Sequence, residues 1–151
     1  MPLGPVDRFL SRLISAQRIP IIGHLVRQLL KLLGTDIPPG TLQPGNRLLT
    51  PHGAKVVVHV SCRIGSDVTL NQNVVLGRGD SWKEVSPGFD GIVLEDNVFV
   101  GAGAVVLATR EPVVIGRGAI IGANSVLTHS IEPWTIWAGN PARLVGARVP
   151  L

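Results

Sequence analysis

The chain has 151 residues, enough for one domain with a buried core, and 45% of them are hydrophobic while 16% are charged. Its 18 glycines and 12 prolines argue against a helical bundle, and its apolar content argues against disorder. The single cysteine, Cys62, excludes an internal disulfide framework and is typical of a cytosolic protein. We therefore expect one cytoplasmic globular domain.

The formal net charge of +4 is concentrated near the N-terminus. Residues 1–35 contain five basic side chains and one acidic side chain, whereas residues 36–151 contain nine of each sign. Stacking aromatic residues are scarce, with 3 Phe and no Tyr. A nucleic-acid-binding surface needs basic residues interleaved with such aromatics, so we expect no nucleic-acid partner.

Residues 1–35 are predicted to form two short amphipathic helices. The stretch "VDRFLSRLISAQ" places apolar residues at helical spacing, and "IIGHLVRQLLKLLG" does so again after Pro20 and ends at Gly34. Neither stretch has the 18 or so unbroken apolar residues of a membrane span, and no signal-peptide cleavage pattern follows. Two interpretations stay open: the apolar faces pack on the protein, or residues 1–35 make peripheral contact with an anionic membrane.

A period of six residues begins near Val58. Aliphatic side chains recur every six residues, often followed by Gly or Asn, which suit a tight corner. The aliphatic positions are Val58, Ile64, Leu70, Leu76, Leu94, Val100, Ile115, Ile121 and Leu127. Small side chains stand four positions later, at Cys62, Val68, Val74, Val98, Ala104, Ala119 and Ser125. This is the hexapeptide signature of a parallel β-helix, in which three hexads form one triangular coil.

We therefore predict an all-β chain: a parallel β-helix over residues 36–151, preceded by the two helices and closed by an extension from Ile131 to Leu151. Two interruptions of the period are predicted to leave the coil. "GRGDSWKEVSPGFDG" is a polar, turn-rich loop, and "ATREP" is a shorter bulge. Loops on a rigid solenoid are frequent sites of specificity.

Several motifs resemble those of the hexapeptide acyltransferases. "RGAIIGANSVLTHSIEPWTIWAGNPARLVG" is similar to their closing coil and C-terminal segment, and "HGAKVVVHVSCRIGSDV" resembles the stretch of serine acetyltransferases that opens with the catalytic histidine. The resemblance covers roughly residues 36–148 and omits the large N-terminal helical domain of those enzymes. It implies a left-handed β-helix, a homotrimer with active sites between subunits, and acetyl-CoA as co-substrate, with no metal.

The resemblance assigns the role of general base to His52. Acetyl transfer to an alcohol requires a base that removes the hydroxyl proton, and a neutral imidazole can do so near pH 7. Asp90 is a second catalytic candidate, either orienting His52 or contacting the acceptor. A structural role for His52, as a turn residue after Pro51, is the alternative interpretation.

The resemblance also implies that acetyl-CoA lies along corners built from small residues, where a ligand can reach the main chain. An arginine guanidinium is well shaped for the CoA phosphates. The candidates for CoA binding are Gly77, Gly101, Ala102, Gly103, Ala104, Gly122, Ala123, Arg117 and Arg143. The glycines also admit a purely geometric explanation, as residues that the coils require.

The residues expected to bind the acceptor depart from those of the serine enzymes. Those enzymes have an Asp before the catalytic histidine and an Asp-Arg-His run in a loop; here Pro51 precedes His52, and the run falls on Phe89, Asp90 and Gly91. Without that Arg and His, the carboxylate of serine would lose charge-assisted hydrogen bonds worth about 1.5–3 kcal/mol each. We therefore expect a sugar or polysaccharide precursor as acceptor, with serine as the alternative.

Two other classes of β-helix protein are alternatives. A zinc enzyme resembling the γ class of carbonic anhydrase needs three histidines, two of them close in sequence, but His52 and His59 are seven residues apart. A non-catalytic β-helix scaffold would retain the coil without the acceptor machinery. The intact CoA motifs favour an enzyme over a scaffold.

Overall fold

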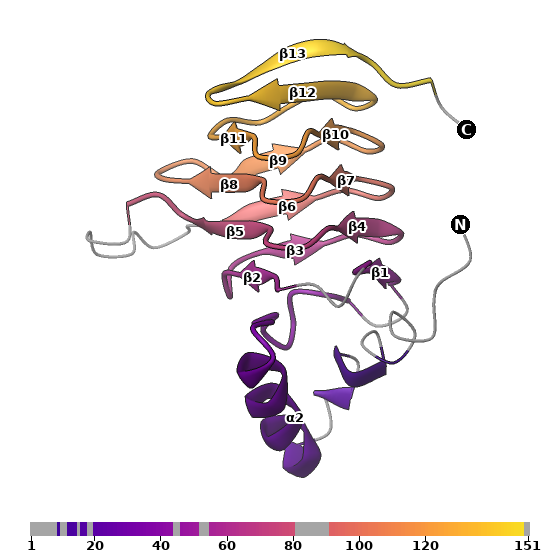
Figure 1. Ribbon diagram of the computed structural model, residues 1–151, viewed down its shortest axis with the longest axis vertical. Coiled ribbons are helices and arrows are strands. Elements are labelled where there is room, and N and C mark those ends of the chain that lie inside the picture. The colour runs from indigo at the N-terminus through magenta and orange to yellow at the C-terminus, as the bar shows by residue number, and fades with distance from the viewer. Residues whose placement is uncertain are drawn as a thin grey trace.

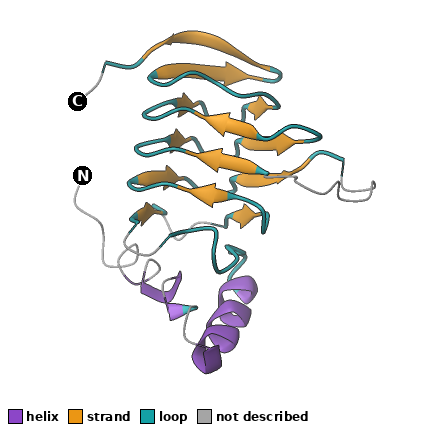
Figure 2. Cartoon of the chain, turned by 180° about the vertical axis from the view of Figure 1, so that it is seen from behind, coloured by secondary structure: helices purple, strands orange, loops and turns teal. Residues whose placement is uncertain are grey.

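The computed structural model describes residues 9, 12–14, 16–17, 20–43, 46–51, 55–80 and 91–149. It consists of a stack of triangular coils with helix α2 (Pro20–Leu32) at its N-terminal end, as Figures 1 and 2 show. The strands are β1 (Leu48–Leu49), β2 (Val57–Val58), β3 (Arg63–Ile64), β4 (Val68–Leu70), β5 (Val75–Arg78), β6 (Ile92–Leu94), β7 (Phe99–Val100), β8 (Val105–Ala108), β9 (Val113–Ile115), β10 (Ile120–Ile121), β11 (Val126–Leu127), β12 (Thr135–Gly139) and β13 (Ala142–Ala147).

Successive strands lie in three different sheets. Sheet I has the order β1–β4–β7–β10–β12–β13, sheet II has β11–β8–β5–β2, and sheet III has β3–β6–β9. From β1 to β11, paired strands are parallel and come from neighbouring coils, as the register of Leu70 with Val100 and of Val100 with Ile121 shows. The parallel β-helix predicted from the hexapeptide period is confirmed.

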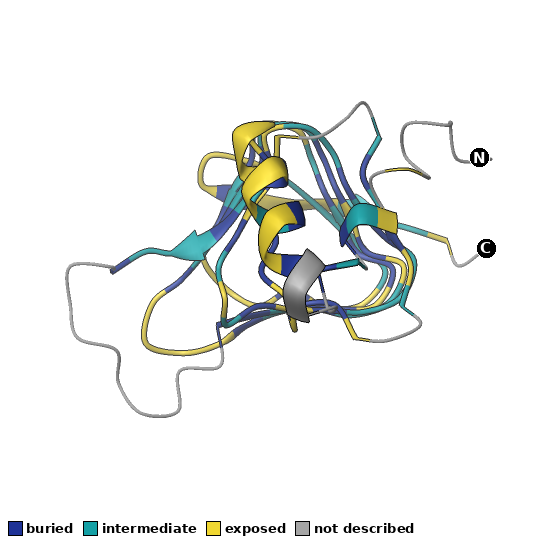
Figure 3. Cartoon of the chain, turned by 90° about the horizontal axis from the view of Figure 1, so that it is seen from below, coloured by how far each residue is buried: buried dark blue, intermediate teal, exposed yellow. Residues whose placement is uncertain are grey.

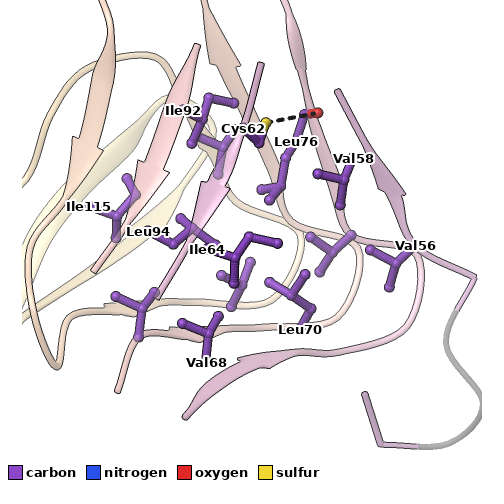
Figure 4. Packing of buried hydrophobic residues seen from close by; sticks show 14 of the residues in the cluster. Val56, Val58, Cys62, Ile64, Val68, Leu70, Leu76, Ile92, Leu94 and Ile115 are labelled. Carbon is purple, nitrogen blue, oxygen red and sulfur yellow. Dashed lines mark hydrogen bonds between the residues drawn. The ribbon is translucent and has the colours of Figure 1, made fainter. Parts of the chain in front are cut away.

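The core runs along the axis of the coils. The aliphatic side chains predicted to point inward, such as Ile64, Leu70 and Leu76, are fully buried, and Figure 4 shows them stacked against one another. The small side chains of the repeat, including Cys62 and Val68, share the same interior. Each fully buried aliphatic side chain stabilises the fold by about 1.5–3 kcal/mol, so the repeat itself supplies most of the driving force.

The structure describes one of the two predicted interruptions of the hexapeptide period in full and the other only in part. The "ATREP" bulge is confirmed, because Thr109, Arg110 and Glu111 are exposed between β8 and β9 while Ala108 remains in the core. Most of the longer predicted loop, residues 81–90, lies outside the described residues. Its start is described, and there the Arg78 Nε donates a 2.7 Å hydrogen bond to Asp80 Oδ1, with both side chains almost buried.

Helix α2 closes the N-terminal end of the core. Val26 and Leu30 pack into the same cluster as Ile14, and Phe9, residues 12–14 and Ala16 are helical in the first predicted helix. Both predicted helices are therefore present, and a domain boundary after residue 35 stays a prediction. Among the described residues, no helix combines the length and the apolar character needed to cross a membrane.

The C-terminal extension forms a hairpin. β12 continues sheet I beside β10, and β13 then returns antiparallel to β12, so the hairpin covers the last coil. Ser125 Oγ, at a buried small position of that coil, accepts a 3.0 Å hydrogen bond from the backbone N–H of Gly139. The hairpin thereby fixes the small residues of the final corner.

Candidate functional site

The corner between sheets I and II repeats on successive coils and carries most of the predicted CoA-binding residues. It comprises residues 71–74, 101–104 and 122–125, each segment joining a strand of sheet I to a strand of sheet II. We call this the small-residue corner. Three of its positions, Asn73, Gly103 and Asn124, have positive φ angles of 60°, 69° and 54°, the conformation of a tight turn that Gly and Asn tolerate.

Most backbone N–H groups of this corner hold the coils together. Gly101 donates to Ile121 O at 2.8 Å and Gly122 donates to Trp137 O at 2.8 Å. Within the part of the chain that the structure describes, the N–H groups of Ala102 and Ala123 have no hydrogen-bond partner. These two residues occupy equivalent positions on neighbouring coils, so the corner has unpaired backbone donors at the same place on two successive coils.

The glycines of the corner are required by the coil geometry. A Cβ atom at Gly101 would lie 2.5 Å from the Ala123 nitrogen, and one at Gly122 would lie 2.9 Å from Ala138 Cβ. Gly103 combines positive φ with a Cβ position 2.3 Å from Asn124 Oδ1. The spacing of the coils therefore explains these glycines.

Two predicted CoA-binding residues, Gly77 and Arg117, lie outside the corner. Ala104 lies within it, with its side chain buried in the core and its N–H donating to Gly101 O at 3.2 Å. Arg117 lies at the opposite edge of sheet I, where its N–H donates to Glu95 Oε2 at 2.6 Å and its guanidinium approaches Asp96 Oδ2 at 3.5 Å. Gly77 lies within β5 of sheet II, half-buried.

Arg143 is brought to the corner from the C-terminal hairpin. It pairs in register with Ala138, and Ala138 is the residue that approaches Gly122. Its side chain is exposed, and its Nη1 donates a 3.0 Å hydrogen bond to Ala142 O. Arg143 is thus placed at the end of the small-residue corner, where its guanidinium is available to contact a phosphate group.

Arg117 takes part instead in a polar hollow of about 380 Å³ at the corner between sheets III and I. Arg63 and Arg117 supply two positive charges there, and Glu95 and Asp96 supply two negative charges. Because these charges balance, no net charge in the hollow selects a ligand. Among the described residues, no group of three His, Cys, Asp or Glu side chains could hold a metal ion.

Gly91 occupies the position to which the resemblance assigns the second histidine of the serine enzymes. Its φ is +70°, and a Cβ atom there would lie 2.4 Å from Ser61 O. The backbone at this position therefore has no room for any side chain. Sequence reasoning named Gly91 as a departure but missed this constraint, for which the turn sequence "FDG" was the available signal.

His59, beside that position, is another residue whose environment the sequence did not predict. It is half-buried rather than fully solvent-facing, and its Nδ1 accepts a 3.2 Å hydrogen bond from the Ser61 N–H. The acceptor role of Nδ1 places the proton of a neutral imidazole on Nε2. His52 and Asp90 lie outside the described residues, and their catalytic roles stay predictions.

The family defined as the hexapeptide repeat of succinyl-transferase matches residues 91–129. The serine acetyltransferase of Staphylococcus xylosus is 34% identical over 131 residues, which are 83% of this chain and 55% of that protein. The chain belongs to the hexapeptide-repeat transferases and is close to the serine acetyltransferases. This hexapeptide-repeat chain spans about half the length of the curated relatives it matches.

Solved structures agree with this assignment. The soybean serine acetyltransferase apoenzyme aligns with a TM-score of 0.69 and 30% identity, over 93% of this chain and 55% of that one. A serine acetyltransferase in complex with CoA aligns with a TM-score of 0.62 and 25% identity, over 93% and 54%. The left-handed β-helix expected from the resemblance is confirmed for this hexapeptide-repeat chain.

Proposed function

We propose that this chain is an acetyl-CoA-dependent O-acetyltransferase. The observation that carries the proposal is the small-residue corner, where the N–H groups of Ala102 and Ala123 on neighbouring coils have no hydrogen-bond partner among the described residues and Arg143 lies at the end of the corner. A ligand with amide groups along an extended arm and phosphates at one end matches that arrangement. The likeness to a serine acetyltransferase solved with CoA supports the same ligand.

His52 is proposed as the general base, and it falls in the chain between β1 and β2. Its neutral imidazole would take the acceptor hydroxyl proton as the oxygen attacks the thioester carbonyl carbon. The C–O bond forms, the C–S bond breaks, and the proton passes from the imidazolium to the departing CoA thiolate. Asp90 is proposed to orient His52 or to contact the acceptor.

A homotrimer with active sites between subunits is part of the proposal. The outer face of sheet II presents an aliphatic row, in which Val57, Val75, Val105 and Val126 are neighbours on successive coils. None of these four residues is fully buried in the single chain, and Val57 is 48% exposed. An uncharged row of this kind is suited to contact with another copy.

L-Serine is the acceptor that the comparisons favour, rather than the sugar expected from the sequence, because the relative from Staphylococcus xylosus and the aligned solved structures are serine acetyltransferases. A sugar hydroxyl is the second candidate, and one observation favours it. Gly91 has no room for the histidine that the serine enzymes place there, and Pro51 replaces their aspartate. A sugar has no carboxylate, so it does not need those partners.

The test is release of CoA thiol from acetyl-CoA by the purified protein, measured with L-serine and with a panel of sugars and nucleotide sugars. Release with serine alone identifies the first acceptor, and release with a sugar alone identifies the second.

His52→Ala should lower turnover about 10²–10⁴-fold while CoA binding persists. His24→Ala, at an exposed position of α2, is the matched control and should behave as wild type. Full activity in His52→Ala would remove His52 from the mechanism, and CoA binding without turnover would favour a scaffold.

A further inference from the structure

Helix α2 has three distinct sectors around its axis. Val26 and Leu30 are buried in the core cluster and Gly23 is buried against Gln17, and a polar flank follows. The remaining sector is apolar and exposed: it contains Leu25, Leu29 and Leu32, and Leu33 follows directly after the helix; these leucines are 70%, 47%, 84% and 54% exposed. We call these four residues the leucine stripe. Their spacing of four, three and one residues keeps them on one face at 100° per residue.

The leucine stripe lies where an extended surface can reach it. Figure 3 views the molecule from the α2 end, and the helix lies in front of the coils with much of its ribbon coloured as exposed. Figure 1 shows the same helix projecting beyond the N-terminal coil of the β-helix. Contiguous exposed apolar side chains on a projecting element mark an interaction surface rather than ordinary surface leucines.

Charge distinguishes the possible occupants of this surface. Residues 1–35 contain five basic side chains against one acidic side chain, while residues 36–151 are balanced at nine of each. All of the net charge of +4 is therefore on the segment that holds the leucine stripe. Helix α2 itself contains His24, Arg27 and Lys31 but no acidic residue.

The polar flank keeps a positive charge in spite of two ion pairs with Asp36. Asp36 Oδ1 lies 3.5 Å from Arg27 Nη2, and Asp36 Oδ2 lies 3.3 Å from Lys31 Nζ. One carboxylate thus faces two cations, and the side chain of Lys31 is still 42% exposed. Asp36 thereby holds the side chains of Arg27 and Lys31 at the side of the helix, next to the leucine stripe.

We propose that the leucine stripe and the basic residues around it bind the surface of an anionic lipid bilayer, with α2 lying in the plane of the interface. Apolar insertion and attraction between cations and anionic headgroups act together in such helices. A second copy of the chain is a less suitable occupant, because two segments of net charge +4 would repel each other.

The experiment is flotation of the full-length protein with two kinds of vesicle, phosphatidylcholine mixed with phosphatidylglycerol and phosphatidylcholine alone. We expect binding to the anionic vesicles that weakens on raising the salt concentration, and at least about tenfold weaker binding to the neutral ones. The double variant Leu25→Gln/Leu32→Gln should bind anionic vesicles at least about tenfold more weakly. Lys31→Gln should weaken binding about fivefold.

Leu144→Gln is the matched control, because Leu144 is 57% exposed on β13 at the other end of the molecule. It should bind vesicles as the wild type does. Circular dichroism verifies that each variant is folded, and the assay needs no acetyl-CoA, so its outcome is independent of the proposed reaction. Failure of the wild type to float, or equal flotation of the stripe variant, overturns the proposal. A lower mass by light scattering in the stripe variant, without vesicle binding by the wild type, would assign the stripe to a second copy.

Discussion

A Cβ atom placed on Gly101 would lie 2.5 Å from the backbone nitrogen of Ala123, on the next coil of the β-helix. The obstacle is main chain, so it cannot move aside as the end of a side chain can. Gly101→Ala should therefore lower the free energy of unfolding by about 1–3 kcal/mol, the usual cost of overpacking. Urea denaturation followed by circular dichroism measures the loss.

Gly77→Ala provides the comparison for that prediction. A Cβ atom on Gly77 would lie 3.6 Å from the nearest side-chain atoms, of Leu107 and Val75, which is an ordinary contact. This variant should unfold within about 0.5 kcal/mol of the wild type. If both variants lost the same stability, close approach of the coils would not be the reason for glycine at position 101.

The period of six predicted the interior of this protein closely, because each coil must place the same kind of side chain at the same angle. Ile64, Leu70 and Ser125 are buried where the repeat placed them. The hairpin of β12 and β13 was not predicted in detail, since it lies beyond the last full hexad and pairs antiparallel. The repeat carries no information about how the chain ends.

The site was predicted only in part, because a hexapeptide pattern fixes position along a coil but not which corner a polar side chain serves. Arg117 and Arg143 were grouped as phosphate contacts, yet Arg117 is held by Glu95 and Asp96 at another corner. Arg143 lies near the small-residue corner because it pairs with Ala138 in the hairpin, and Ala138 lies beside Gly122. Such placement depends on tertiary pairing that no local motif encodes.

Position 91 tests whether the backbone itself excludes a side chain. Gly91→Ala must accommodate both φ of +70° and a Cβ position 2.4 Å from Ser61 O. Gly40 has φ of +97° but no atom within 4 Å of its Cβ position, so Gly40→Ala carries backbone strain alone. We expect Gly91→Ala to lose about 1–3 kcal/mol more than Gly40→Ala in urea denaturation. Equal losses would show that the contact with Ser61 relaxes freely.

The two arginines offer a matched test of the proposed CoA site. Arg143→Ala should raise KM for acetyl-CoA about tenfold or more with a smaller effect on kcat, because a charge-assisted phosphate contact would be lost. Arg117→Ala should leave KM for acetyl-CoA unchanged, since Arg117 lies at the opposite edge of sheet I. Initial rates over a range of acetyl-CoA concentrations measure both. A raised KM in Arg117→Ala and an unchanged KM in Arg143→Ala would instead assign the phosphate site to the corner between sheets III and I.

Cys62 gives a prediction about chemical reactivity. Burial raises the pKa of its thiol from an ordinary 9.0 to about 11, more than the hydrogen bonds with Ile92 and His59 lower it. The thiolate is the reactive form, so at pH 8 the folded protein should react with a disulfide reagent at least about 100-fold more slowly than the denatured protein. Thiol release followed by absorbance measures both rates. Rapid reaction of the folded protein would show that this part of the core opens readily.

The same shift links stability to alkaline pH. The fold favours the neutral thiol, so its contribution to stability is complete below pH about 9 and is lost as the pH rises toward about 11. Cys62→Val removes the titrating group and keeps an inward side chain of the kind found at Val68 and Val74, positions of the same repeat. The free energy of unfolding of the variant should therefore fall less between pH 8 and 11 than that of the wild type, as urea denaturation at each pH would measure. Parallel curves for the two proteins would mean that Cys62 does not contribute to alkaline unfolding.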